Sequence, residues 1–213
     1  MSTLLAHLQS RLSELELDLP PGVQARLIKY IDLLARWNKA YNLTAIRDPM
    51  AMVDRHLVDA LAVLPHCRRP DLADIGTGPG IPGLVLALVQ PYERVWLVDS
   101  NGKKARFLRE CLRQFDLPYV VVHEARAEAL APAAFSQVIS RAYSDLATFI
   151  SSTKQLLAPD GRWLAMKGKV PGSEIEPLPD DVIVERIDVL KVPGADGERC
   201  LVTLCRAIPS NRS

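Results

Sequence analysis

Apolar residues recur three or four positions apart through the first third of the chain, a spacing typical of helices that bury one face. Pro20-Pro21-Gly22 interrupts this pattern, because proline and glycine disfavour the interior of a helix. Asp48 followed by Pro49 has the residue types preferred at the N-cap and first position of a helix. The pattern therefore predicts helices over residues 3–18, 23–40 and 49–64, with a hinge over 65–70.

From residue 71 onward, short apolar runs alternate with helical patterns. The runs predict strands over residues 71–76, 94–99, 119–123, 136–141, 161–167, 182–191 and 199–206. The segments between them predict helices over residues 81–89, 102–115, 145–157 and 172–177. Such alternation is typical of a mostly parallel sheet with helices on both faces. The last two strands are separated only by a turn-rich segment, so we expect them to pair antiparallel.

This order of elements predicts an α/β fold with a seven-stranded, mostly parallel sheet and an antiparallel C-terminal hairpin. It is the Rossmann-like layout of class I methyltransferases that use S-adenosylmethionine (SAM). We expect two regions, an N-terminal helical region over 1–65 and a SAM-binding domain over 66–213.

The composition of the chain limits which partners and which cellular location we expect. A hydrophobic content of 48% is ample for a core, and a formal net charge of +1 means that only a local basic patch would attract a polyanion. No apolar run is long enough to span a bilayer. The four cysteines have neither C-x-x-C nor metal-ligand spacing. We therefore expect reduced thiols, no metal, no membrane attachment and a cytoplasmic location.

A glycine-rich stretch, Asp74-Ile75-Gly76-Thr77-Gly78-Pro79-Gly80-Ile81-Pro82-Gly83, joins a predicted strand to a helix. Its last six residues match the dinucleotide pattern G-x-G-x-x-G letter for letter. Two prolines argue against a bound pyrophosphate, because they lack the N–H donors that phosphates need. Asp74 would also repel a diphosphate, whereas it suits the ammonium group of SAM. We therefore expect a SAM site that includes Asp74, Gly76, Gly78, Gly80 and Ile81.

Two later segments are candidates for the nucleoside part of a cofactor. Asp99 ends the second strand of the sheet, about 20 residues past the glycine loop, where an acid binds ribose hydroxyls in such folds. A helix N-cap is the alternative role for Asp99, and this feature alone does not separate SAM from NAD. Ala127 and Glu128 follow the third strand and are candidates to contact adenine, although a solvated helix start is an equally good interpretation.

Three residues at the ends of the fourth and fifth strands are candidates for contact with the methyl acceptor. Arg141 suits an electron-rich acceptor or a phosphate, and Tyr143 could stack on a base. Lys167 is a candidate for contact with a phosphate or the acceptor atom. Structural alternatives are an ion pair of Arg141 with an acid such as Asp145, and a solvated Lys167.

Basic residues are concentrated in two places, over 26–69 and over 103–113. A patch of this kind could hold RNA through phosphate contacts, with aromatic residues such as Trp37 and Tyr41 available for stacking. Ordinary solvated helix faces have a similar composition, so this pattern alone leaves both interpretations open. His56 is isolated from any nucleophile and is more typical of a packing residue than of a catalytic base.

Several stretches together resemble the bacterial small-subunit ribosomal RNA guanine-N7 methyltransferase family, also called the glucose-inhibited division protein B family. They are Trp37-Asn38-Lys39-Ala40-Tyr41-Asn42-Leu43-Thr44, Arg55-His56-Leu57-Val58-Asp59, the glycine-proline stretch, Ser140-Arg141-Ala142 and Lys167-Gly168. The resemblance implies SAM as methyl donor and N7 of guanine 527 in 16S rRNA as acceptor. It also implies cofactor contacts around Gly76, Ile81, Ala127, Glu128 and Arg141.

The implied chemistry needs no general base, because guanine N7 carries a lone pair and no proton. We expect Arg141 and Lys167 to act at the site of transfer, the N-terminal region to face RNA, and the chain to be a monomer. The partner is expected to be 16S rRNA or the small ribosomal subunit. Two other hypotheses are an NAD-dependent oxidoreductase and an RNA-binding module without catalysis.

Overall fold

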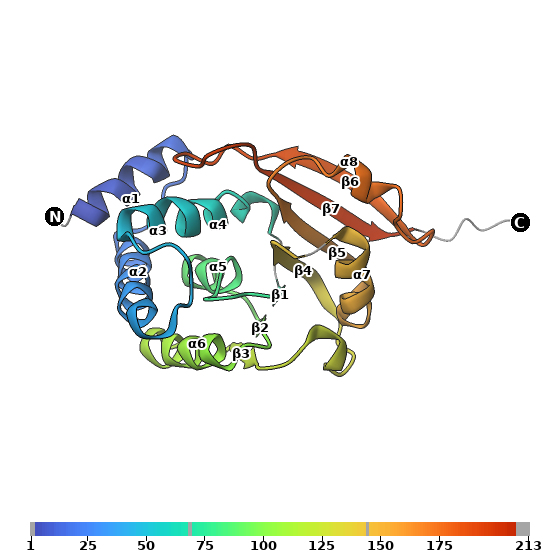
Figure 1. Cartoon of the computed structure of the whole chain (residues 1–213), viewed down its shortest axis with the longest axis horizontal. Helices are drawn as coiled ribbons and strands as arrows, with labels where there is room; N and C mark the ends of the chain where they lie inside the picture. Colours follow the sequence, from blue (N-terminus) through green and yellow to red (C-terminus); the bar gives the residue numbers. More distant parts are fainter. Residues whose placement is uncertain (1–2, 68–69, 144, 208–213) are drawn as a thin grey trace, which may run out of the picture.

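The computed structural model describes residues 3–67, 70–143 and 145–207, which form one seven-stranded sheet flanked by helices (Figure 1). The strands are β1 Asp71–Ile75, β2 Arg94–Val98, β3 Val120–His123, β4 Phe135–Arg141, β5 Leu157–Lys167, β6 Val182–Val189 and β7 Cys200–Arg206. Their order across the sheet is β3-β2-β1-β4-β5-β7-β6, with β7 antiparallel to both of its neighbours. The predicted fold class, including the antiparallel hairpin, is confirmed.

The helices divide between an N-terminal group and the connections of the sheet. The N-terminal group consists of α1 Thr3–Glu14, α2 Pro21–Tyr41, α3 Pro49–Met52, the π-helix η1 Val53–Val58, α4 Asp59–Leu61 and the 3₁₀ turn η2 Leu64–His66. The others are α5 Gly83–Val89, α6 Gly102–Phe115, η3 Ala127–Ala129, α7 Leu146–Thr153, η4 Lys154–Leu156 and α8 Gly172–Ile175. The hinge predicted over 65–70 includes residues 68–69, which lie outside the described residues.

The third predicted helix differs most from its expected form. Asp48 caps it as predicted, because its carboxylate accepts a hydrogen bond from the Ala51 amide at 2.8 Å. Its middle turn, Val53–Val58, is a π-helix rather than an α-helix, and the helix ends at Leu61 rather than at residue 64. Short π-helical segments inside helices occur frequently at functional sites. The periodicity of three or four residues does not distinguish this wider turn from an α-helix.

Two hydrophobic cores lie on opposite faces of the sheet. One contains side chains of the N-terminal helices, α5 and α6, and reaches sheet residues such as Leu72 and Leu201. The other lies under α7 and includes the fully buried Trp163 and Phe135. The N-terminal helices therefore share one core with the sheet, and Figure 1 shows α2 beside α6 on the same side of the molecule. No helix among the described residues is long and apolar enough to cross a membrane.

The topology places the loops after β1 and β4 next to one another. From β1 the chain moves outward to β2 and β3, and then returns to add β4 on the other side of β1. Asp74 on β1 accordingly lies between Leu97 on β2 and Ile139 on β4. In open α/β sheets, ligands bind at the carboxyl ends of the strands where the order reverses in this way.

Candidate functional site

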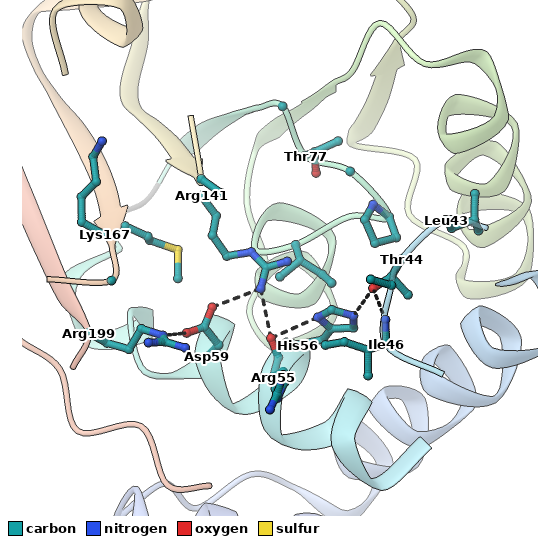
Figure 2. A pocket seen from close by; sticks show the side chains of 18 of the residues that line it. Leu43, Thr44, Ile46, Arg55, His56, Asp59, Thr77, Arg141, Lys167 and Arg199 are labelled. Atoms are coloured by element: carbon teal, nitrogen blue, oxygen red, sulfur yellow. Dashed lines mark hydrogen bonds and ion pairs between the residues drawn. The ribbon is translucent and has the colours of Figure 1, made fainter. Parts of the chain in front are cut away.

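A cavity of about 760 Å³ opens at this point of the sheet (Figure 2). One wall is the glycine loop after β1, and another is formed by the ends of β4 and β5. The N-terminal region closes the cavity with the loop from Leu43 to Ile46 and with side chains of the helical run from Val53 to Leu61. Residues of both predicted regions therefore build a single site.

The glycine loop follows a path that depends on its glycines. Gly76, Gly78 and Gly80 have φ angles of 68°, 61° and 103°, which side chains rarely adopt. Gly76 and Gly78 line the cavity, as does Ile81, whereas Gly80 packs beneath the loop against Leu84. The loop also receives support from the N-terminal region, because the buried Tyr30 hydroxyl donates a hydrogen bond to the Pro79 carbonyl at 3.0 Å.

The Asp74 side chain holds this loop from below and does not line the cavity. Its Oδ2 accepts hydrogen bonds from the Thr77 hydroxyl at 2.6 Å and the Gly83 amide at 2.7 Å. Its Oδ1 is buried without a hydrogen-bond partner in the described part of the chain. The sequence placed this acid against a ligand, whereas its burial directs the carboxylate to the loop itself.

Asp99 holds the same loop from the end of β2. Its Oδ2 accepts a hydrogen bond from the Gly78 amide at 2.9 Å, and its Oδ1 accepts one from the Asn101 amide at 2.9 Å. The Lys104 ammonium lies 3.5 Å from Oδ2. The helix N-cap considered for Asp99 is instead Asn101, whose side chain accepts from the Lys103 amide at 3.0 Å.

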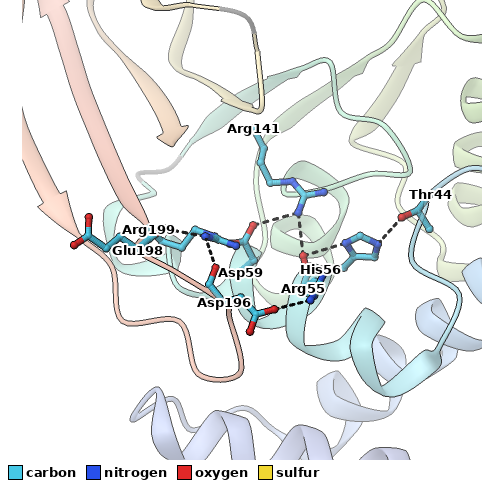
Figure 3. Close-up of polar contacts among 8 residues, drawn as sticks. All are labelled: Thr44, Arg55, His56, Asp59, Arg141, Asp196, Glu198 and Arg199. Carbon is cyan, nitrogen blue, oxygen red and sulfur yellow. Dashed lines mark hydrogen bonds and ion pairs between the residues drawn. The ribbon is translucent and has the colours of Figure 1, made fainter. Parts of the chain in front are cut away.

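Arg141 is the centre of a polar network on the floor of the cavity (Figures 2 and 3). Its Nη1 donates to the Arg55 carbonyl at 3.0 Å and to Oδ2 of Asp59 at 3.2 Å. The other oxygen of Asp59 accepts from Nε of Arg199 at 3.3 Å. Since the Asp59 side chain is only 9% exposed, one nearly buried carboxylate holds two arginines that line the cavity. The sequence suggested Asp145 as the acid partner, but Asp145 caps α7.

His56 connects this network to the loop that follows α2. Its Nδ1 lies 3.0 Å from the Arg55 carbonyl, and its Nε2 lies 3.1 Å from the Thr44 hydroxyl. A carbonyl only accepts, so Nδ1 carries the proton and the Nε2 lone pair accepts from Thr44. Burial, together with the positive charge of Arg141, lowers the pKa of His56 to about 4. His56 is therefore a neutral residue with both ring nitrogens engaged.

The other predicted site residues lie nearer the edges of the cavity or beyond it. Lys167 lines the cavity, and its ammonium pairs with Glu174 at 2.7 Å. Ala127 is buried in η3, where its carbonyl accepts from Gln155 at 2.9 Å, and Glu128 is exposed beside it. Neither of these two residues lines the cavity.

The structure also adds residues that the sequence patterns did not single out. Thr44 and Asp59 belong to stretches noted for their resemblance, but nothing indicated that they meet in one site. Lys104 was noted only as part of the basic segment 103–113, and Arg199 was not noted at all. Both residues line the cavity. Arg199 comes from the β6–β7 connection, about 140 residues from Asp59, so no local pattern predicts this contact.

Asp74 and His56 have pKa values displaced in opposite senses relative to the unfolded chain. Burial raises the pKa of Asp74 to about 6, against hydrogen bonds from Thr77 and Gly83 that lower it. Between about pH 4 and 6, the folded state holds a proton that the unfolded state has lost, so stability from Asp74 falls as pH rises. For His56 the unfolded state holds the extra proton between about pH 4 and 6.5, so stability from His56 rises with pH.

We expect single variants to separate these two contributions. Between pH 6.5 and 4, the free energy of unfolding should fall more steeply for Asp74→Asn than for the unchanged protein, and less steeply for His56→Gln. The difference should be about 2–3 kcal/mol for each variant, since one pKa unit corresponds to about 1.4 kcal/mol. Urea unfolding at several pH values measures it. Parallel curves for all three proteins would contradict the buried titrations.

Comparison with known proteins identifies the family. The family model described as rRNA small subunit methyltransferase G matches residues 23–202. The ribosomal RNA small subunit methyltransferase G of Xanthomonas oryzae pv. oryzae is 52% identical over 191 residues, which cover 89% of this chain and 90% of that protein. The protein of the same name from Halorhodospira halophila is 48% identical over 203 residues, covering 94% and 96%.

Solved structures with lower sequence identity share the fold. A ribosomal protein L11 methylase from Lactobacillus delbrueckii subsp. bulgaricus is 15% identical, with a TM-score of 0.57 and coverage of 71% of this chain and 77% of that chain. M. jannaschii TYW2 in complex with AdoMet is 16% identical, with a TM-score of 0.53 and coverage of 70% and 73%. Together with the match over residues 23–202, these findings show that the chain belongs to the rRNA small subunit methyltransferase G family.

Proposed function

We propose that this protein transfers the methyl group of SAM to 16S rRNA, at N7 of the guanine that the family resemblance implies. The observation that carries the proposal is the match of the family model over residues 23–202, which includes all the walls of the cavity. Cytoplasmic location and a monomeric state are part of the same proposal.

The residues at the carboxyl ends of β1 and β2 fit SAM. The glycines at positions 76 and 78 leave the backbone of the loop open to close approach, and their φ angles exclude most side chains. Asp99 lies at the end of β2, where it would take the ribose hydroxyls while its other contacts hold the loop. Lys104 and Arg141 are cations of the lining that would take the cofactor carboxylate. Bound SAM would supply a methyl group on a positively charged sulfur.

The chain contributes position and exclusion of water rather than proton transfer. Guanine N7 attacks as a lone pair, so no proton has to be removed. His56 fits this requirement, because its neutral ring has its lone pair occupied by Thr44 and is not available as a general base. Arg141 and Lys167 lie at the ends of neighbouring strands and would orient the target nucleotide through its phosphate or O6. A base in an RNA hairpin must leave its stack to enter such a cavity.

Label transfer tests the proposal directly. The purified protein should move tritium from methyl-labelled SAM into small ribosomal subunits or free 16S rRNA from cells that lack the modification. Chemical cleavage at 7-methylguanine should then map the label to a single position. Absence of label from both substrates would contradict the activity, and label on another base atom would contradict N7 as the acceptor. Small subunits that already carry the modification are the control and should accept no label.

A further inference from the structure

Helices α2 and α6 pack against each other on one side of the molecule (Figure 1). Near one end, the ring of Trp37 on α2 lies 5.7 Å from the ring of Phe107 on α6. At the other end, Arg26 donates to the Phe115 carbonyl at 3.0 Å, and the Lys29 ammonium lies 5.3 Å above the Phe115 ring. Rising residue numbers on α2 therefore correspond to falling numbers on α6.

The surface along this helix pair is lined with cations. On α6, positions 103, 106, 110 and 113 are three or four residues apart and therefore share one face. They are occupied by Lys103, Arg106, Glu110 and Arg113. Arg113 pairs with Glu110 at 2.8 Å, which uses the carboxylate of this face. Lys103 and Arg106 are exposed and have no ion pair in the described part of the chain.

The facing side of α2 adds two further cations to this surface. Lys29 reaches the carbonyl of Gln114 at 3.5 Å, which places it at the C-terminal end of α6. Arg36 lies near Glu110: hydrogen bonds from Arg113 and Gln114, with the charges of Arg113 and Arg36, together lower the pKa of Glu110 to about 2. Both α2 side chains are exposed. Asp32 lies one turn from both of them on α2 and offsets part of this charge, but with Lys103, Arg106 and Arg113 on α6 the surface keeps an excess of cations and favours an anionic partner.

One end of the cationic surface lies at the cavity. The C-terminal end of α2 leads directly to Thr44 and Ile46, and the first turn of α6 carries Lys104. All three residues line the cavity. From there the surface extends along α6, whose 14 residues span about 21 Å at about 1.5 Å per residue. A strand with one base in the cavity could therefore place its neighbouring phosphates on the helix pair.

We propose that Arg36, Lys103 and Arg106, with Lys29 farther along, bind the phosphates of the rRNA strand that leads away from the target base. This inference rests on the proposed function, since it needs an RNA substrate in the cavity. RNA is favoured over an acidic protein surface because the cations follow a line that starts at the nucleotide site. Arg26 differs from these residues, since its guanidinium is used to cap the C-terminal end of α6.

A triple variant, Arg36→Ala with Lys103→Ala and Arg106→Ala, tests the proposal. Alanine is a good helix former at these exposed positions, so folding should be retained. The dissociation constant for 16S rRNA, measured by filter binding against salt concentration, should rise at least tenfold. The slope of log affinity against log salt should fall by about two, at ~0.7 per phosphate contact. SAM affinity by calorimetry should be unchanged.

The matched control removes three basic residues from the part of the molecule around β5 and β6, away from α6, with Lys154→Ala on η4, Arg162→Ala on β5 and Arg186→Ala on β6. It should bind 16S rRNA with nearly the unchanged affinity and salt slope. Equal losses in the two triple variants would overturn the proposal, as would unchanged rRNA binding in the first. A defect seen only with assembled subunits would assign the surface to a ribosomal protein and would also overturn it. Failure of the unchanged protein to methylate any ribosomal substrate would instead contradict the proposed function itself.

Discussion

The Gly83→Ala variant should bind SAM at least about 100-fold more weakly than the unchanged protein. A Cβ at this position would lie 2.6 Å from Cβ of Asp74 and 2.7 Å from Cδ2 of Leu97. Both neighbours are fully buried on adjacent strands, so neither can move aside easily. The helix start would have to shift, which breaks the hydrogen bond from the Gly83 amide to the Asp74 carboxylate.

The size of this effect follows from two costs. Overpacking a close-packed interior costs about 1–3 kcal/mol. A lost hydrogen bond to a buried charged group costs about 1.5–3 kcal/mol. If the displaced loop weakens SAM binding by only part of these two costs, about 2.7 kcal/mol, the dissociation constant rises about 100-fold. Calorimetric titration with SAM and thermal unfolding measure the two consequences separately.

Gly22→Ala is the matched control for this variant. Gly22 lies in the first turn of α2, and a Cβ added there meets nothing within 4 Å. This substitution should leave SAM affinity unchanged and stability unchanged or slightly higher, since alanine favours a helix over glycine. If Gly83→Ala bound SAM as tightly as Gly22→Ala, the loop would not depend on the contact between Gly83 and Asp74.

The Arg141→Ala variant should lower the turnover number for rRNA methylation by about 100-fold, the size of loss expected when a reacting group is misplaced by about 1 Å. Arg141 is 25% exposed and reaches the cavity while two protein acceptors, the Arg55 carbonyl and Asp59, hold its guanidinium in place. Loss of its charge should also raise the pKa of both Asp74 and His56, because the arginine lowers each of them. Steady-state kinetics with saturating SAM measure the first effect, and NMR titration of the His56 ring measures the second.

Two further variants separate charge from geometry at Arg141. Arg141→Lys keeps the positive charge but cannot present a planar fork to two acceptors. The pKa of His56 should therefore return close to its value in the unchanged protein, whereas the turnover number should stay low. Asp59→Asn keeps the shape of the acid and removes its charge, which frees both Arg141 and Arg199. It should lower turnover with little change in SAM affinity. Unchanged turnover in both Arg141→Ala and Asp59→Asn would remove this network from the reaction.

Much of the fold was predictable because its information is local. Each strand and helix of the sheet domain is specified by apolar spacing and by residues that start or stop it, such as the Asn101 and Asp145 side chains that cap α6 and α7. The predicted strands differ from the observed ones by a few residues at their ends, as for β5, which begins at Leu157 rather than 161. The glycine loop was also predictable, since glycine adopts the φ angles found at positions 76, 78 and 80 far more readily than other residues do.

The π-helical turn over Val53–Val58 and the buried contacts of Asp74 were not predictable in this way. A wider helical turn has nearly the same apolar spacing as an α-helix, and burial depends on what packs against a residue from elsewhere. The acid read as a ligand for a cation instead anchors the loop to the start of α5. Lys167 lines the cavity at the end of β5, but no local pattern indicated that its ammonium also pairs with Glu174 on the connection after β5.

The sequence alone determined the fold class, the glycine loop and the family resemblance, because these depend on residue type and spacing within single segments. Only the tertiary structure decided which distant residues meet. It placed Arg199 against Asp59 across 140 positions, and His56 between Thr44 and the Arg55 carbonyl. It also set the cations of α2 beside those of α6. Such contacts depend on how the helices pack against the sheet. That packing involves residues of two hydrophobic cores from many parts of the chain, so no single segment determines it.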